Sequence, residues 1–123
     1  MNAKILLIED NEQNRYLATF LLEKHGFSVT HTPEGRAGIE LATSRPFDLI
    51  LLDIQLPQMD GHAVARELRG NPALNHVPIV AVTSYAMEGD REKALEAGCN
   101  GYIEKPIDPD TFVTQISTFL PRL

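Results

Sequence analysis

The chain has 123 residues, of which 43% are hydrophobic and 23% charged, and it carries a net charge of −6. This length fits one domain with its own core, because a chain of about this size buries roughly two-thirds of its unfolded surface. The acidic balance argues against nonspecific binding to nucleic acid or to anionic membranes.

The cysteine content and the distribution of apolar residues predict a cytoplasmic protein. Cys99 is the only cysteine, so no internal disulfide can form and a reducing compartment is expected. No uncharged apolar run approaches the about 18 residues that read as a membrane span. The N-terminus lacks the basic segment and long apolar core of an export signal.

Strand and helix patterns alternate along the chain. Short β-rich runs predict five strands: Lys4–Ile8, Phe27–Thr32, Asp48–Leu52, Val77–Val82 and Tyr102–Ile103. Caps, glycines and prolines predict five helices. The first three run from Asn11 or Glu12 to Lys24, from Thr32-Pro33 onward, and from Asp60 or Gly61 to Arg69. The fourth follows Val82, has Asp90 as a fresh cap after Gly89 and stops at Gly98, and the fifth runs from Asp108-Pro109 to Pro121. Right-handed crossovers then give a doubly wound α/β sandwich.

Apolar residues at helical spacing predict the buried face of each helix. Leu17, Phe20 and Leu21 mark that face in the first helix, and Ala37 and Leu41 mark it in the second. Gly35 and Gly38 fall inside the second helix, where each costs roughly 0.5–1 kcal/mol relative to alanine. We expect the aromatic residues of the helices to lie in the core: Tyr16, Phe20, Phe112 and Phe119.

The run Leu49–Asp53 is apolar until it ends in a single carboxylate. Such a run is typical of a parallel strand buried on both faces. Open parallel sheets place their chemistry just beyond the carboxyl ends of the strands, so Asp53 is expected at a reactive position. A loop punctuated by Pro57 and Asp60-Gly61 follows it.

Polar residues at the other strand ends should converge on Asp53. They are Glu9 and Asp10 after the first strand, Thr83 after the fourth and Lys105 after the fifth. Two like charges about 4 Å apart repel by roughly 4 kcal/mol at an effective dielectric of 20, so three carboxylates need neutralisation. Lys105 and a hard divalent cation would supply it, and Mg²⁺ prefers one or two carboxylates together with waters and phosphate oxygens.

This set of groups suits phosphoryl transfer to a carboxylate. A carboxylate beside Mg²⁺ can attack phosphorus and become an acyl phosphate. The phosphoryl oxygens need positive charge and hydrogen-bond donors, which the metal, the Thr83 hydroxyl and the Lys105 ammonium would provide.

Together these residues resemble the receiver domain of bacterial two-component response regulators over essentially residues 1–123. The motifs are Glu9-Asp10-Asn11, then Asp53 with Pro57, Met59 and Asp60-Gly61, then Thr83-Ser84, and finally Tyr102 with Lys105-Pro106. The resemblance implies a flavodoxin-like five-stranded parallel sheet of order 2-1-3-4-5 with five helices.

The resemblance also implies a role for each matched residue. Asp53 would accept a phosphoryl group from a histidine kinase or phosphotransfer protein, and the chain would act as a signalling switch rather than as an enzyme. The implied ligands of Mg²⁺ are Glu9, Asp10, Asp53 and the backbone carbonyl of Gln55. Lys105 would contact the phosphate, and the Lys105–Pro106 bond would be cis.

Phosphorylation would be read out at a surface. Thr83 and Tyr102 would couple it to the face formed by the fourth helix, fifth strand and fifth helix, where a downstream protein binds. Gln55 and Tyr85 vary across the family and are thought to tune hydrolysis of the acyl phosphate. Glu9 stands where aspartate is frequent, and Gly38 stands where alanine is usual.

Three alternatives can be compared with the sequence. Nothing follows Leu123, so no output domain is expected, although the residues could also be a receiver excised from a hybrid histidine kinase or a larger regulator. An aspartate-based phosphohydrolase would need an acid two residues after its nucleophile, where this chain has Gln55. A flavodoxin-like cofactor binder would need a phosphate loop in place of Glu9-Asp10-Asn11.

Overall fold

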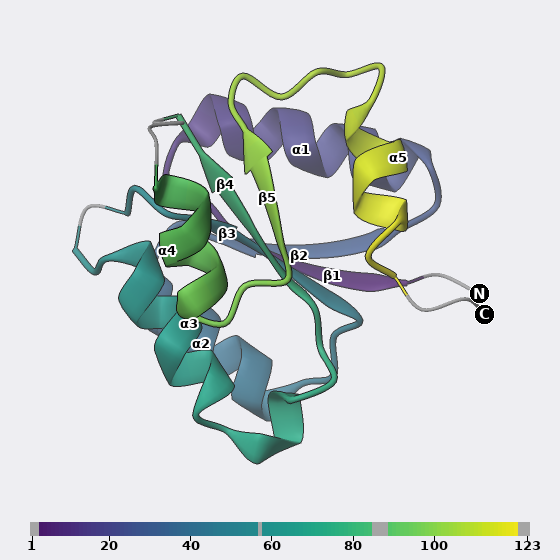
Figure 1. The fold of residues 1–123 in the computed structure, drawn as a ribbon. Coiled ribbons are helices and arrows are strands. Elements are labelled where there is room, and N and C mark those ends of the chain that lie inside the picture. Colours follow the sequence, from purple (N-terminus) through teal and green to yellow (C-terminus); the bar gives the residue numbers. More distant parts are fainter. Residues whose placement is uncertain (1–2, 57, 85–88, 121–123) are drawn as a thin grey trace.

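A computed structural model describes residues 3–56, 58–84 and 89–120. One sheet of five parallel strands has the order β2-β1-β3-β4-β5. The strands are β1 Lys4–Ile8, β2 Ser28–Thr32, β3 Leu49–Asp53, β4 Ile79–Thr83 and β5 Gly101–Glu104. The helices are α1 Glu12–Lys24, α2 Gly35–Ser44, α3 Gly61–Arg69, α4 Asp90–Glu96 and α5 Phe112–Ser117. The predicted flavodoxin-like fold is confirmed (Figure 1).

Two layers of helices sandwich the sheet, with α1 and α5 on one face and α2, α3 and α4 on the other (Figure 1). Successive residues of a strand point to opposite faces, so each inner strand feeds both cores. In β1, Leu6 and Ile8 pack toward α2, α3 and α4, whereas Ile5 and Leu7 pack toward α1 and α5.

The central strand β3 explains the apolar run that the sequence shows. It lies between β1 and β4, and every residue from Leu49 to Asp53 is buried. Asp53 is therefore a carboxylate at the end of a strand that is enclosed on both faces. Among the described residues, no helix is long and apolar enough to cross a membrane.

Two helices begin where they were predicted to, each after a residue whose side chain caps it. The Asn11 side chain accepts a hydrogen bond from Asn14 N at 2.9 Å, and the Asp60 side chain accepts one from His62 N at 3.1 Å. Each side chain satisfies a backbone donor that the first helical turn leaves unpaired.

Two other helices begin later than predicted because the expected cap residue takes part in a different interaction. Thr32 stays in β2, where its carbonyl oxygen accepts from Glu9 N at 3.0 Å, so α2 begins at Gly35. Asp108 instead closes a turn, accepting from Asp110 N at 2.9 Å, and α5 begins only at Phe112. Gly89, with a φ of 90°, precedes α4, which makes Asp90 its first residue rather than its cap.

The prediction for the aromatic residues is half wrong. Phe112 is buried and Phe119 is partly buried, but Tyr16 is 71% exposed and Phe20 is 50% exposed. Their rings stack on each other with centroids 6.3 Å apart. The buried face of α1 consists of small and aliphatic side chains instead: Ala18, Leu21 and Leu22.

Gly38 has a packing reason that the helix pattern does not reveal. The core side of α2 consists of Gly35, Gly38, Ile39 and Ala42, while Ala37 and Leu41, which were predicted to face the core, are only partly buried. A Cβ atom on Gly38 would lie 2.3 Å from Cδ1 and 2.6 Å from Cγ1 of the buried Ile8. The glycine therefore lets α2 approach β1 closely.

We predict that Gly38→Ala lowers the free energy of unfolding by about 1 kcal/mol. Overpacking against Ile8 costs about 1–3 kcal/mol, and it outweighs the gain in helix propensity of roughly 0.5–1 kcal/mol. Urea denaturation of both chains measures the difference. Adding Ile8→Val, which removes the nearest methyl group, should recover part of the loss.

Gly70→Ala is the matched control, since Gly70 has a right-handed φ and a Cβ there would lie no closer than 3.4 Å to Glu67 O. We expect its effect to stay within about 0.5 kcal/mol. A Gly38→Ala chain at least as stable as the Gly70→Ala chain would contradict the packing argument.

Candidate functional site

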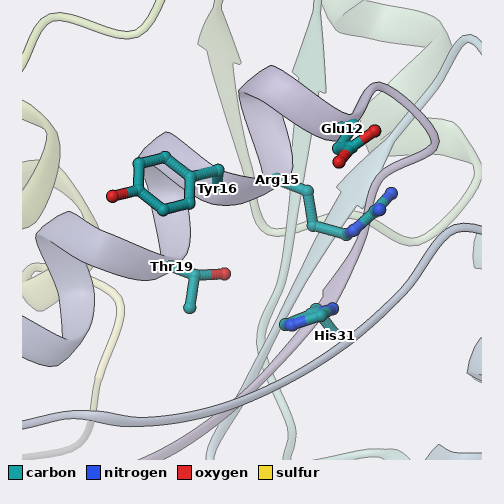
Figure 2. A pocket seen from close by; sticks show the side chains of 5 residues that line it. All are labelled: Glu12, Arg15, Tyr16, Thr19 and His31. Carbon is teal, nitrogen blue, oxygen red and sulfur yellow. The ribbon is translucent and has the colours of Figure 1, made fainter.

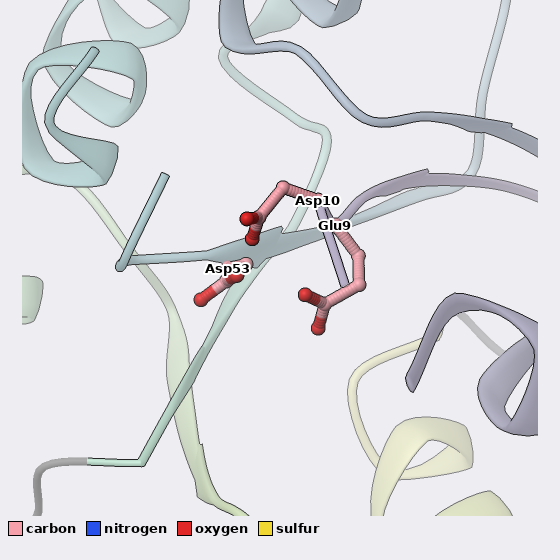
Figure 3. Close-up of side chains that lie close together, drawn as sticks. All are labelled: Glu9, Asp10 and Asp53. Atoms are coloured by element: carbon pink, nitrogen blue, oxygen red, sulfur yellow. The ribbon is translucent and has the colours of Figure 1, made fainter. Parts of the chain in front are cut away.

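The carboxyl ends of the strands bring the predicted residues together at one edge of the sheet. Glu9 and Asp10 follow β1, and Asp53 ends β3, whose residue Leu52 pairs with Ile8. One oxygen from each of the three carboxylates lies within 4.8 Å of the other two (Figure 3). The predicted convergence of these carboxylates is therefore present.

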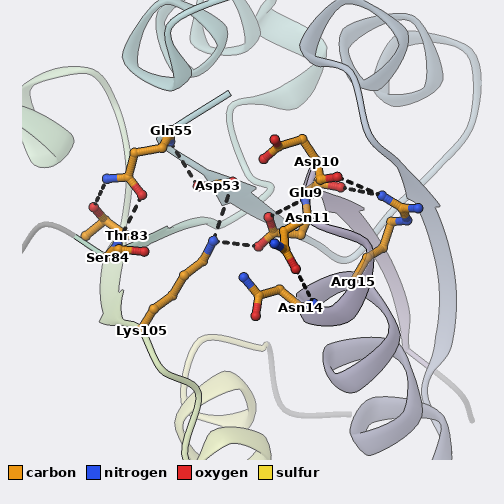
Figure 4. A network of polar contacts seen from close by, with 10 residues as sticks. All are labelled: Glu9, Asp10, Asn11, Asn14, Arg15, Asp53, Gln55, Thr83, Ser84 and Lys105. Atoms are coloured by element: carbon orange, nitrogen blue, oxygen red, sulfur yellow. Dashed lines mark hydrogen bonds and ion pairs between the residues drawn. The ribbon is translucent and has the colours of Figure 1, made fainter. Parts of the chain in front are cut away.

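Lys105 lies between two of the carboxylates. Its Nζ is 2.8 Å from Glu9 Oε1 and 3.5 Å from Asp53 Oδ2 (Figure 4). The lysine side chain is only 9% exposed, and the two acidic side chains are 4% and 3% exposed. In so little water a charge needs a close partner, and each of these has one.

Backbone groups hold the carboxylates in place. Asn11 N donates to Glu9 Oε2 at 3.1 Å, and Gln55 N donates to Asp53 Oδ1 at 2.9 Å. The Arg15 guanidinium, one turn into α1, donates to the carbonyl oxygens of Glu9 at 3.0 Å and Asp10 at 3.3 Å. The β1–α1 turn is thus tied to the first turn of the helix that follows it.

The loop after Asp53 closes tightly because of Gly61. Gly61 N donates to Ile54 O at 3.1 Å. A Cβ on Gly61 would lie 2.4 Å from Ile54 Cα and 2.7 Å from Asp53 O, which are backbone atoms that cannot move aside. Only glycine permits α3 to start against the end of β3.

The local electrostatics favour a cation at this edge. Burial raises the pKa of Asp53, and the neighbouring Glu9 carboxylate adds to the effect. Burial likewise raises the pKa of Asp10, and Asp53 contributes after it. Three carboxylates against one ammonium leave negative charge uncompensated. The possible ligands are all oxygen atoms, and one of them, from Asp10, is exposed to solvent. Such a set fits a hard divalent cation.

Thr83 and Gln55 meet on the other side of Asp53. The Gln55 Nε2 group donates to Thr83 Oγ1, and Ser84 N donates to Gln55 Oε1 at 3.0 Å (Figure 4). No local pattern predicts this side-chain bridge, since Gln55 lies 28 residues from Thr83 and 29 residues from Ser84 in the chain.

Tyr102 lies in the same region of the site. Together with Gln55, Thr83 and Asp90 it lines a hollow of about 330 Å³. Burial raises the pKa of its hydroxyl, and the Asp90 carboxylate adds to this. The Lys105–Pro106 peptide bond is cis, the isomer that the resemblance implies. Tyr85 lies outside the described residues.

A second hollow, of about 220 Å³, lies beside α1 and is lined by Glu12, Arg15, Tyr16, Thr19 and His31 (Figure 2). Sequence reasoning missed it because it assigned Tyr16 to the core. Arg15 connects it to the acidic edge through the carbonyl contacts described above.

Comparisons with known proteins agree with this geometry. The sequence model of the response regulator receiver domain matches residues 5–117. The polar-differentiation response regulator DivK of Brucella ovis is 39% identical over 120 residues, which cover 98% of this chain and 98% of DivK.

Solved structures include a similar receiver domain with a metal. The receiver domain of the sensor histidine kinase PA1611 from Pseudomonas aeruginosa PAO1, with a magnesium ion coordinated in its active site cleft, is 34% identical with a TM-score of 0.88. The match covers 97% of this chain and 98% of that one.

The chemotaxis response regulator CheY4 of Vibrio cholerae has a TM-score of 0.92 at 24% identity, covering 98% and 100% of the two chains, and this likeness concerns the fold alone. The family match and the DivK match together span nearly the whole sequence. The chain belongs to the response regulator receiver domain family.

Proposed function

We propose that Asp53 is the phosphoryl acceptor of this receiver domain and that the domain extends over residues 1–123. The contact of the Lys105 ammonium with both Glu9 and Asp53 carries this proposal. It keeps a buried carboxylate beside a fixed positive charge, at the edge of the sheet where reactive groups of such folds lie. Gln55 stands where a phosphohydrolase would need a second acid, which argues for the receiver function.

Transfer of the phosphoryl group to Asp53 forms one bond and breaks another. A carboxylate oxygen attacks phosphorus, the bond from phosphorus to the donor's nitrogen or oxygen breaks, and its electron pair leaves with the donor. Lys105 offsets the charge that remains on the phosphoryl oxygens. Thr83, at the end of β4, offers a hydroxyl from the neighbouring strand.

The cluster of carboxylates supports a proposal for the ligands of the metal. Glu9, Asp10 and Asp53 would hold Mg²⁺ together with the Gln55 backbone carbonyl, and the similar receiver domain of PA1611 has a magnesium ion coordinated in its active site cleft. When bound, the ion supplies positive charge to the phosphoryl oxygens.

A histidine kinase is the partner that the family implies. Direct transfer from a phosphotransfer protein, and the cytoplasm as location, are our proposals. The buried, unpaired thiol of Cys99 supports the cytoplasmic location because it suits a reducing compartment.

The face formed by α4, β5 and α5 is our candidate for downstream protein binding. Tyr102 and Phe119 line a hollow of about 360 Å³ between β5 and α5, and Leu95 of α4 is 43% exposed. Phosphorylation adds acceptor oxygens and about −1.5 to −2 charge. We propose that the Thr83 hydroxyl moves toward those oxygens and that the Tyr102 ring turns inward beside it.

We predict Mg²⁺-dependent phosphorylation of the purified chain by acetyl phosphate, because Asp53 has the charge partner and the metal ligands that the reaction needs. Intact-mass spectrometry should show one added phosphoryl group, which disappears with EDTA and in Asp53→Asn. Asp48→Asn, at the opposite end of β3, is the control and should keep the adduct. An undiminished adduct in Asp53→Asn would refute the assignment.

We predict that Thr83→Ala uncouples Tyr102 from the site. A hydrogen bond to a charged acceptor contributes about 1.5–3 kcal/mol, so its loss should reduce the switched population about tenfold or more. Beryllofluoride mimics the phosphoryl group, and NMR shifts of the Tyr102 ring report the response. Thr83→Ser keeps the hydroxyl and should respond like the native chain. If Thr83→Ala responds fully, the two residues are not a switch pair.

A further inference from the structure

The Gln55 side chain joins the loop after β3 to Thr83, which ends β4, and to Ser84, which follows it. Ser84 N can only donate a hydrogen bond, so the Gln55 atom that faces it must be Oε1. This orientation places Nε2, a donor, against Thr83 Oγ1. The carboxamide therefore fits its two partners in one orientation only, with an acceptor for Ser84 and a donor for Thr83.

The groups that Gln55 holds are those that a phosphoryl group on Asp53 would need. Thr83 ends β4, and its neighbour Val82 pairs with Asp53 in the sheet. The hydroxyl of Thr83 and the backbone amide of Ser84 can both donate, and they lie on the Gln55 side of Asp53 (Figure 4). A phosphoryl group offers acceptor oxygens with more charge than the carboxamide oxygen, and charge-assisted hydrogen bonds are roughly twice as strong as neutral ones.

We propose that the Gln55 carboxamide is a latch that holds Thr83 and Ser84 in the unphosphorylated arrangement and releases them to the phosphoryl group. The proposal rests on Asp53 as the phosphoryl acceptor. Gln55 is then a positioning residue, which acts through Thr83 and Ser84 and not by contact with the reacting phosphorus.

The latch is linked to the acceptor through the backbone. Gln55 N donates to Asp53 Oδ1 at 2.9 Å, so the carboxylate that gains the phosphoryl group also anchors the residue that bears the latch. Loss of the carboxylate's full charge weakens this bond at the moment when stronger acceptors reach Thr83 and Ser84. Phosphorylation thereby loosens Gln55, competes with its Oε1 for the Ser84 amide, and draws the Thr83 hydroxyl, which accepts from Nε2, toward the phosphoryl oxygens.

The latch lowers the population of the switched state before phosphorylation. Each hydrogen bond that must break adds to the free energy of switching, and a ligand that favours the switched state must offset it. Removal of the carboxamide should therefore raise the affinity for a phosphoryl mimic. If Gln55 instead bound the phosphoryl oxygens itself, removal would lower that affinity.

The experiment compares the native chain with Gln55→Met, which has nearly the same shape but no amide. Isothermal titration with beryllofluoride in Mg²⁺ should show about threefold to tenfold tighter binding in the variant. Gln58→Met, an exposed glutamine of the same loop, is the control and should bind like the native chain. In a Thr83→Val background the effect of Gln55→Met should shrink, because one partner of the latch is already gone.

Amide hydrogen exchange tests the latch without any metal or phosphoryl mimic. The Ser84 amide of metal-free Gln55→Met should exchange about threefold to tenfold faster than in the native chain. In the native chain, beryllofluoride should shift the NMR signals of the Gln55 side-chain amide toward those of a solvated glutamine, a readout that requires no variant.

The outcomes separate the latch from the function on which it rests. Faster Ser84 exchange with tighter binding supports the latch. Equal or weaker binding by Gln55→Met overturns it, as does Ser84 exchange at the native rate. If the native chain does not bind beryllofluoride, Asp53 as acceptor is wrong and the latch as its regulator falls with it.

Discussion

The contact of Lys105 with Glu9 and Asp53 is the interaction on which the rest of the site depends. Two carboxylates with almost no exposure would repel each other, and the buried ammonium allows them to remain together. The three charges come from the ends of β1, β3 and β5, so only the assembled sheet brings them together. The site therefore forms only when the chain has folded.

The residues that stabilise the fold and the residues of the candidate site lie in different parts of the sheet. The alternating side chains of the inner strands fill two apolar cores. Among the described residues, the buried polar ones lie at or just beyond the carboxyl ends of strands: Glu9, Thr32, Asp53 and Thr83. Close packing supports this arrangement where space is smallest, as Gly38 does against Ile8 and Gly61 does against Ile54.

The sequence predicts this site well because strand ends of a parallel sheet must share an edge, so residues such as Asp53 and Lys105 can be located from local patterns. It predicts helix starts poorly at Thr32 and Asp108, because the Thr32 carbonyl oxygen accepts from Glu9 N, far away in the chain, and the Asp108 side chain closes a turn with Asp110 N instead of capping a helix. The exposure of Tyr16 and the bridge from Gln55 to Thr83 depend on how segments far apart in the chain pack. Such contacts have no signature in the sequence.

Of the two carboxylates beside Lys105, we propose that Asp53 receives the phosphoryl group. Borohydride reduces an acyl phosphate to an alcohol and so marks the acceptor residue permanently. The chain is phosphorylated with acetyl phosphate and Mg²⁺, reduced, digested and mapped by tandem mass spectrometry. We expect homoserine at position 53 and nowhere else. Reduction at position 9, 10 or any other carboxylate, with position 53 unchanged, would contradict it.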